Sequence, residues 1–243
     1  MNIAELARDW TRLGEQDPLW AVYVAPETRG GRWDVEEFLA VGRREVDAAF
    51  AQLPRLGLHP GRRLALDFGC GVGRLSAALA GRVDRVLAVD VAESMLDVAR
   101  RMDRTGGRVR YVLNRSEDLS FVPSASVDVV YSSLVLQHLP PVLVRGYLRE
   151  FARVLAPDGA AVVQVASRPT LSVKGLVFRW APWPLVRWGQ RRLLGYPAPM
   201  RMSATRRSDV EGALAGTPVR VVAAQPDDSY GGHWHYVRYF LGR

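Results

Sequence analysis

Short aliphatic runs alternate with amphipathic stretches through the middle of the chain. Apolar residues dominate the runs at 64–68, 85–90, 108–113, 127–132 and 160–166. The segments between them, such as GRLSAALAGR, ESMLDVARRM and LVRGYLREFARVL, repeat apolar residues at the spacing of a helix that buries one face. Strands that alternate with helices in this way predict crossover connections and a mostly parallel sheet with helices on both faces.

The two ends of the chain extend this pattern. TRRSDVEGALAG predicts another helix, and two further strands are expected at 219–224 and 233–241. We therefore predict a seven-stranded α/β domain at 59–243, with an inserted flap at 169–204 after the fifth strand. Residues 1–58 are expected to form a helical N-terminal lobe. Its aromatic residues Trp20, Tyr23 and Trp33 either cover a functional site or only pack onto the sheet.

Composition excludes several classes of protein. The 243 residues are 48% hydrophobic and 24% charged, which is typical of a globular chain with one sizeable core. Cys70 is the only cysteine, so a disulfide framework is excluded. No apolar run approaches the roughly 18 residues of a membrane span, and the first residues lack the layout of a secretory signal. We expect a cytoplasmic location.

The net charge of +8 comes from one segment. Between Asp158 and Asp209 the chain has nine cations and no acid, while the remainder holds 24 cations against 25 acids. Within this segment, residues 174–194 interleave three tryptophans with arginines, a combination suited to a lipid–water interface. We expect this stretch to contact a membrane surface or an anionic group of a ligand. The alternative is a solvated face of arginines around a local aromatic core.

A glycine-rich turn carries the chemistry. In LALDFGCGVGRL, Gly69, Gly71 and Gly73 separate a predicted strand from a predicted helix, where the backbone can approach a ligand closely. Asp90 ends the next predicted strand, where its carboxylate can accept hydrogen bonds from both hydroxyls of a ribose. The dinucleotide fingerprint needs a further glycine at the position of Arg74. The spacing therefore indicates a nucleoside ligand other than NAD.

In these features the chain resembles the class I S-adenosylmethionine-dependent methyltransferases. LDFGCGVG, VLAVDVAESMLDVARR, SEDLSF with SVDVVYSSLVLQHLPP, and EFARVLAPDGAAVVQV resemble the family's motifs in order over 64–166. The resemblance implies a Rossmann-like fold, S-adenosylmethionine as the cofactor, and methyl transfer to an O, N or C nucleophile. The expected acceptor is a small molecule, apolar or lipid-like.

The resemblance also implies the cofactor-binding residues, which follow the first four strands: Asp67, Gly69, Gly71, Gly73, Asp90, Asn114, Ser116, Glu117 and Ser133. Asp67 either caps the following turn or holds the methionine amino group through a water. Family members often bind the adenine amino group with an Asp at the position of Arg115. Asn114, Ser116 or Glu117 is expected to replace it here.

Two histidines are the candidate catalytic residues. His138 follows the fourth strand, where the family's loop approaches the methionine end of the cofactor; it either holds this loop or acts as a base. His233 and His235 alternate along a predicted strand and should share a face, at the substrate mouth or in solvent. We take His138 and His235 as candidate bases. No metal site is expected from four scattered histidines and one cysteine.

Two other functions compete with this interpretation. A basic chain attracts phosphates, which makes an RNA methyltransferase the first rival. However, SSLVLQ follows the fourth strand instead of the Asn/Asp-Pro-Pro-aromatic motif of enzymes that methylate nucleic-acid amino groups, so nucleic acid is not the expected partner. The second rival is a protein that binds the cofactor without catalysis.

Overall fold

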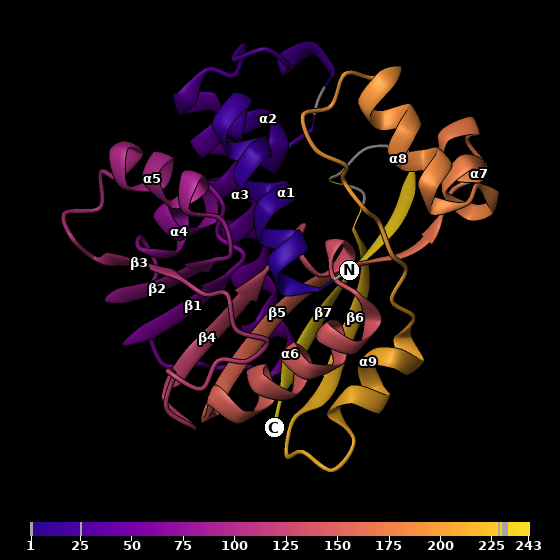
Figure 1. Cartoon of the computed structure of the whole chain (residues 1–243). Helices are drawn as coiled ribbons and strands as arrows, with labels where there is room; N and C mark the ends of the chain where they lie inside the picture. The colour runs from indigo at the N-terminus through magenta and orange to yellow at the C-terminus, as the bar shows by residue number, and fades with distance from the viewer. Residues whose placement is uncertain (1, 25, 228, 230–232) are drawn as a thin grey trace.

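Seven strands form one sheet in the order β3-β2-β1-β4-β5-β7-β6 (Figure 1). The computed structural model describes residues 2–24, 26–227, 229 and 233–243. All neighbouring strands are parallel except β7, which runs antiparallel to both β5 and β6. The strands are β1 (Leu64–Phe68), β2 (Arg85–Asp90), β3 (Val109–Leu113), β4 (Val127–Ser132), β5 (Leu155–Pro169), β6 (Arg220–Asp227) and β7 (Trp234–Gly242). The predicted Rossmann-like sheet is confirmed.

β5 is much longer than the predicted run at 160–166. Its start pairs with β4 through Leu155, and its end follows β7 as far as the pair of Pro169 with Trp234. Partners on both sides therefore extend the strand beyond its apolar centre, because a ladder needs only backbone donors and acceptors.

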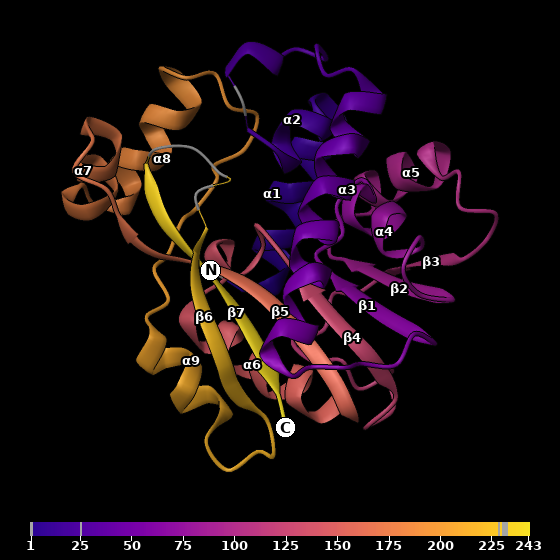
Figure 2. The same cartoon turned by 180° about the vertical axis from the view of Figure 1, so that it is seen from behind.

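Helices cover both faces of the sheet (Figures 1 and 2). Alternate residues of β1 show the division: Ala65 packs with α3, α4 and α5, whereas Leu66 and Phe68 pack with α6 and α9. The helices of these two layers are α3 (Val35–Gln52), α4 (Arg74–Leu79), α5 (Glu93–Met102), α6 (Pro141–Val154) and α9 (Arg207–Leu214). The predicted helices between the strands are all present.

The N-terminal lobe is helical, as predicted, and packs closely onto the sheet domain. It consists of α1 (Ile3–Gln16), α2 (Pro18–Val22) and α3. Gly42 of α3 lies so near α4 that a Cβ there would be 2.6 Å from the backbone oxygen of Arg74. Gly14 of α1 meets Met95 of α5 in the same way. A domain boundary at residue 58 remains a prediction.

The flap contains two short helices, α7 (Val173–Trp180) and α8 (Trp183–Arg192). Pro182 separates them, and Pro184 lies in the first turn of α8, where a proline costs no helical hydrogen bond. The flap and the helices α1 and α2 lie above the same edge of the sheet, where the parallel strands end (Figures 1 and 2). In an open α/β sheet this edge is the usual ligand-binding position.

Candidate active site

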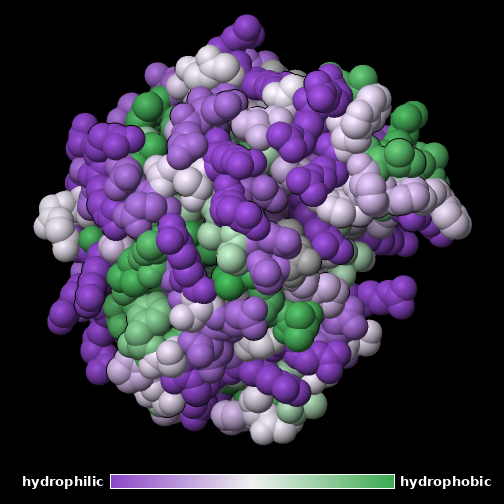
Figure 3. Space-filling model, in the orientation of Figure 1, coloured by the Kyte–Doolittle hydropathy of each residue, from purple (hydrophilic) through white to green (hydrophobic). Residues whose placement is uncertain are grey.

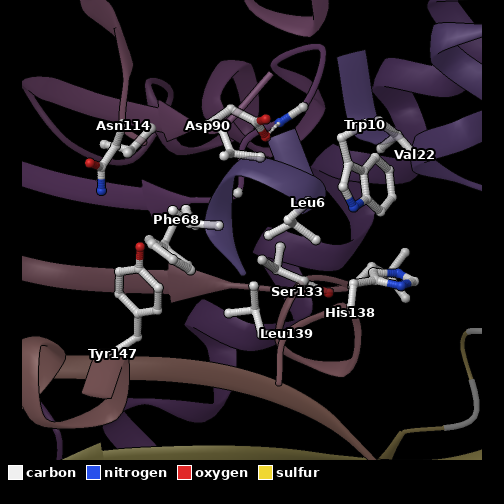
Figure 4. Close-up of a pocket in the computed structure, with 17 residues that line it drawn as sticks. Leu6, Trp10, Val22, Phe68, Asp90, Asn114, Ser133, His138, Leu139 and Tyr147 are labelled. Carbon is white, nitrogen blue, oxygen red and sulfur yellow. Dashed lines mark hydrogen bonds between the residues drawn. The ribbon is translucent and has the colours of Figure 1, made fainter. Parts of the chain in front are cut away.

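A cleft of about 700 Å³, open to solvent, lies at the carboxyl ends of β1 and β2. Figure 4 shows its length: Asn114 and Tyr147 lie at one end, Trp10 and His138 at the other, and Asp90 between them. The ends of β1 and β2 and the loops after β1, β2, β3 and β4 supply most of its lining, and α1, α2 and α6 supply the rest.

The glycine-rich turn borders this cleft in a conformation that requires glycine. Gly69, Gly71 and Gly73 have φ values of +75°, +53° and +82°. A Cβ on Gly71 would lie 2.7 Å from a methyl of Val22, and a Cβ on Gly69 would overlap Val135. Side chains there would be strained and would fill the cleft, so the turn brings the bare backbone to a ligand.

Asp90 holds the turn and faces the cleft at the same time. Its Oδ2 accepts a hydrogen bond from the backbone N–H of Gly71 at 2.8 Å, and its Oδ1 accepts one from Ala92 at 2.9 Å. Burial raises the pKa of this carboxyl, and the hydrogen bonds to Ala92 and Gly71 lower it in part. Each oxygen keeps a lone pair, so Asp90 can still accept the two ribose hydroxyls.

Asp67 lies outside the lining of the cleft. It is 1% exposed, and Oδ2 accepts a hydrogen bond from Ser76 Oγ of α4 at 2.6 Å. Burial raises the pKa of Asp67 to about 7, against a smaller lowering by Ser76 and Arg74. Of its two expected roles, this geometry favours the one that fixes the turn and α4 to β1.

The loop after β3 brings one predicted residue to the cleft and leaves two outside. Asn114 lines the cleft, while its amide donates to the Asp118 oxygen and accepts from the Ser116 N–H, both at 2.9 Å. Ser116 and Glu117 have exposed side chains that are not part of the lining. Tyr147 of α6 lines this end instead and donates its hydroxyl to the Ser116 oxygen at 2.6 Å. Tyr147 could not be singled out from the sequence, because its place on α6 is also a core position.

The loop after β4 is held in an unusual conformation. Ser133 lines the cleft, as predicted, and Leu134 beside it has a φ of +62°, rare for a residue other than glycine. The Leu134 N–H donates to Gln164 at 3.0 Å, and Gln164 donates to Asp227, which also pairs with Arg238. A buried polar chain therefore fixes the loop that carries His138.

His138 lies where the cleft meets the flap. Its Nδ1 is 2.7 Å from the backbone oxygen of Arg201, and its ring packs edge-on against Trp10 with centroids 5.0 Å apart. Burial lowers the pKa of His138 to about 4, with a smaller raising effect of the Arg201 oxygen. The imidazole is therefore neutral near pH 7, and both expected roles, holding a loop and accepting a proton, are open to it.

A second cavity adjoins the first. It has about 1260 Å³ of space open to solvent, and Val22, Leu134 and His138 line both cavities. The segment around α2, the flap and the start of β7 supply its other walls. His235 does not reach it: its side chain is exposed, whereas His233 and Tyr236 are part of the lining. The expectation that His233 and His235 share a face fails because β7 begins only at Trp234.

Arg29 joins the N-terminal lobe to the flap beside this cavity. Its guanidinium donates to the backbone oxygens of Leu194 and Gly195, each at 2.6 Å. The same group lies over the rings of Trp20 and Tyr196, at 5.0 and 5.2 Å from their centroids. The lobe and the flap thus close the second cavity together.

Arg74 takes the position where a dinucleotide-binding turn has its last glycine. Its side chain is 1% exposed and pairs with Glu45 of α3 at 2.9 Å. Tyr23, which lines the second cavity, lies over the Arg74 guanidinium at 5.6 Å. The arginine therefore fastens the N-terminal lobe to the glycine turn.

Comparison with known proteins agrees with this geometry. Residues 65–159 match the model of a methyltransferase domain family. The match includes the glycine turn, Asp90, Asn114, Ser133 and His138, and it leaves out the N-terminal lobe and the flap.

Several methyltransferases resemble the chain around this domain. A malonyl-[acyl-carrier protein] O-methyltransferase of Serratia marcescens is 37% identical over 120 residues, which are 48% of this chain and 43% of the relative. A ubiquinone biosynthesis O-methyltransferase of Xanthomonas campestris pv. campestris is 32% identical over 148 residues, covering 56% and 61%. The chain thus spans less than two thirds of the length of these curated relatives.

A solved structure extends the likeness in fold beyond the methyltransferase domain. The magnesium protoporphyrin IX methyltransferase of Synechocystis PCC 6803, with bound SAH, aligns with a TM-score of 0.67 at 19% identity, over 99% of both chains. At this identity the likeness shows the fold alone.

The described residues contain neither a candidate metal site nor a candidate membrane-spanning helix. Among them, no group of three or more His, Cys, Asp or Glu side chains is arranged to hold a metal ion. No described helix combines the length and apolar character needed to cross a bilayer.

Proposed function

We propose that the protein transfers a methyl group from S-adenosylmethionine to an O, N or C nucleophile of a small, apolar or lipid-like acceptor. The observation that carries the proposal is the wall shared by the two cavities, made by Val22, Leu134 and His138. A cofactor in the first cavity and an acceptor in the second would meet at this wall.

The first cavity suits the cofactor along its whole length. Asn114 and Tyr147 can hold the adenine end, Asp90 the ribose, and the wall near His138 the methionine end (Figure 4). When bound, S-adenosylmethionine supplies an activated methyl group. The protein residues then have to align a nucleophile with it and exclude water, and alignment alone contributes up to roughly 7–11 kcal/mol in model reactions.

His138 is the proposed base when the nucleophile is a hydroxyl. A carbonyl oxygen only accepts hydrogen bonds, so Nδ1 carries the proton toward Arg201 and Nε2 keeps its lone pair. His138 also borders both cavities. His235 is not retained in this role, because its exposed side chain lies away from both linings.

The flap supports a second part of the proposal, contact of residues 174–194 with an anionic membrane surface. Of 13 exposed large hydrophobic residues in the described part of the chain, nine lie between 171 and 194. Trp180 is 74% and Trp188 57% exposed. Figure 3 shows apolar side chains gathered at the outer end of the flap, at the upper right. The arginines of the same segment complement lipid phosphates.

A cytoplasmic location completes the proposal. Cys70 is buried and unpaired, which suits a reducing compartment.

Transfer of a labelled methyl group tests the proposal directly. The protein is incubated with S-adenosylmethionine carrying a labelled methyl group and a cell extract, which is then separated into lipid, aqueous small-molecule and nucleic-acid fractions. We expect label in the lipid fraction, and much less of it with the Asp90→Asn variant at a cofactor concentration below saturation. Label in nucleic acid would contradict the acceptor class, and absence of label from every fraction would favour a cofactor-binding protein without catalysis.

A further inference from the structure

Two buried polar atoms at the second cavity lack hydrogen-bond partners. Oε1 of Gln137 and Nε1 of Trp234 have none in the described part of the chain, although the side chains are only 1% and 8% exposed. Both residues line the second cavity. A buried polar atom without a partner destabilises the folded state, so each of these atoms needs a compensating role.

The backbone around Gln137 fixes this side chain in place. The backbone oxygen of Gln137 accepts from the N–H and the hydroxyl of Ser203, at 2.7 and 3.1 Å. Ser203 also donates to the Leu139 oxygen at 2.9 Å. The turn that carries Gln137 is therefore tied to the end of the flap.

Another glutamine of the same cavity is fully paired. Gln190 of α8 accepts from the backbone N–H of Met200 and donates to the backbone oxygen of Met200, both at 3.0 Å. This amide serves the local fold of the flap. The unpaired end of the Gln137 amide is thus particular to that residue and is no general feature of the cavity.

The lining is nearly free of charge and rich in aromatic rings. Within the part of the chain that the structure describes, Glu27 is the only Asp, Glu, Lys or Arg in it, so none of the cations between 159 and 208 contributes. The ring of Phe178 on α7 packs against Trp234 at 5.7 Å. The other aromatic and thioether side chains of the lining are Tyr23, Tyr196, Tyr236, Met200 and Met202.

We propose that the second cavity binds an uncharged aromatic acceptor with two oxygen substituents, recognised by Gln137 and Trp234. A hydroxyl of the acceptor donates its hydrogen to Gln137 Oε1, and a second oxygen accepts the hydrogen of Trp234 Nε1. The aromatic and methionine side chains contact the ring faces. Because the described residues of the lining include no Lys or Arg to pair with a carboxylate, we expect this cavity to prefer an uncharged ligand. The inference rests on the proposed function in taking this cavity as the acceptor site.

Equilibrium binding of three related probes tests the inference. The probes are naphthalene-2,3-diol, 2-naphthol and naphthalene, with 2-naphthoate as a charged comparison, each titrated into the protein saturated with S-adenosylhomocysteine. We expect affinity to fall about tenfold with each oxygen removed, and naphthoate to bind more weakly than naphthol. Equal affinity for diol and naphthalene, tight naphthoate binding, or no binding of any probe would overturn the inference.

Variants show whether the two named residues carry the discrimination. Gln137→Leu and Trp234→Phe should each remove one tenfold step between probes and leave naphthalene binding within about twofold. Gln190→Leu is the matched control, and the steps should persist in it. A loss shared equally by all probes in Gln137→Leu would assign that residue to packing only.

This experiment separates the inference from the proposed function. No turnover is measured, so the probes report the cavity alone. Labelled methyl transfer to an apolar aliphatic acceptor would overturn the inference and leave the proposed function standing. Stepwise probe binding without methyl transfer to any extract component would overturn the proposed function.

Discussion

Nδ1 of His138 donates a hydrogen bond to the backbone oxygen of Arg201, 2.7 Å away. This bond links the loop after β4 to the end of the flap, across 63 positions of the sequence. It also fixes the tautomer, so the second ring nitrogen is the one able to take a proton. His138 therefore combines a structural bond with a second ring nitrogen in a side chain that lines both cavities.

The two roles of His138 are separable by substitution. In His138→Asn the amide can keep the donor to Arg201, but the second ring nitrogen is lost. We expect the affinity for S-adenosylhomocysteine to stay within about threefold, while turnover of a hydroxyl acceptor falls about 10²- to 10⁴-fold. Calorimetry and initial rates measure the two effects. Turnover within twofold of the unsubstituted protein would leave His138 only its structural bond.

Substitution of Asp90 should weaken cofactor binding. Asp90→Asn replaces a charged acceptor by a neutral one. We expect S-adenosylhomocysteine binding to become weaker by about 1.5–3 kcal/mol. Asp90→Ala should also lower the melting temperature without ligand, because the bonds to Gly71 and Ala92 are lost. Calorimetry and thermal unfolding measure these changes, with the exposed Asp158→Asn as control. Unchanged affinity in both Asp90 variants would reduce this residue to a turn-forming role.

The local part of the site was predictable from sequence. The strand, the glycine turn and Asp90 lie within 27 residues, and short-range pattern determines their arrangement. Trp10 and Tyr147 were not predictable, because an aromatic residue on an amphipathic helix has the same pattern whether it packs in a core or lines a cleft. Only the position of α1 and α6 over the sheet distinguishes these cases.

The alternation of residues along β7 did not predict which side chains line the second cavity, His235 or its neighbours. Strand residues alternate between faces, but pairing with the neighbouring strand sets which residues face which side. β5 and β7 shift register between Ala166 and Arg168, opposite His235. The start and register of β7 thus depend on contacts about 70 residues away in the chain, which the alternation of His233 and His235 does not contain.

Asp67 should make stability depend on pH. Its folded pKa of about 7 lies above the ordinary 3.8, so between these values the folded state holds a proton that the unfolded state has lost. The resulting stabilisation is present at low pH and disappears as pH rises through 7. The Asp67→Asn variant lacks this pH-dependent stabilisation, because its amide does not titrate. The stability of the variant relative to the unsubstituted protein should therefore rise between pH 4 and 8, by on the order of 3 kcal/mol.

Urea unfolding at several pH values measures this difference. His138 has the opposite dependence, since its folded pKa of about 4 lies below 6.5, but it is present in both proteins and cancels. A difference that stays constant from pH 4 to 8 would mean that Asp67 has the same pKa in both states.

Removal of charge from the flap should weaken its contact with anionic lipid. Replacing Arg187, Arg191 and Arg192 by Gln should lower partitioning onto phosphatidylglycerol vesicles by about 3 kcal/mol, roughly 1 per residue, or raise the acceptor Michaelis constant. Cofactor affinity should not change. Sedimentation with vesicles at two salt concentrations measures the effect. The triple change of Arg55, Arg62 and Arg85, which are exposed elsewhere, is the control. Equal partitioning and equal kinetics in both triple variants would leave the basic segment without a role.

The contact of Arg29 with the flap has a consequence for the order of folding. Its partners, the backbone oxygens of Leu194 and Gly195, lie 165 and 166 positions later in the chain. During synthesis the N-terminal helices emerge long before these partners exist, and closing so long a loop is slow. The residues that line the cofactor cleft end at Tyr147, although Gln164 and Arg201 support the loop after β4, whereas the second cavity is also lined by the flap and β7. We therefore expect a nascent chain to acquire its nucleoside site first and its acceptor site last.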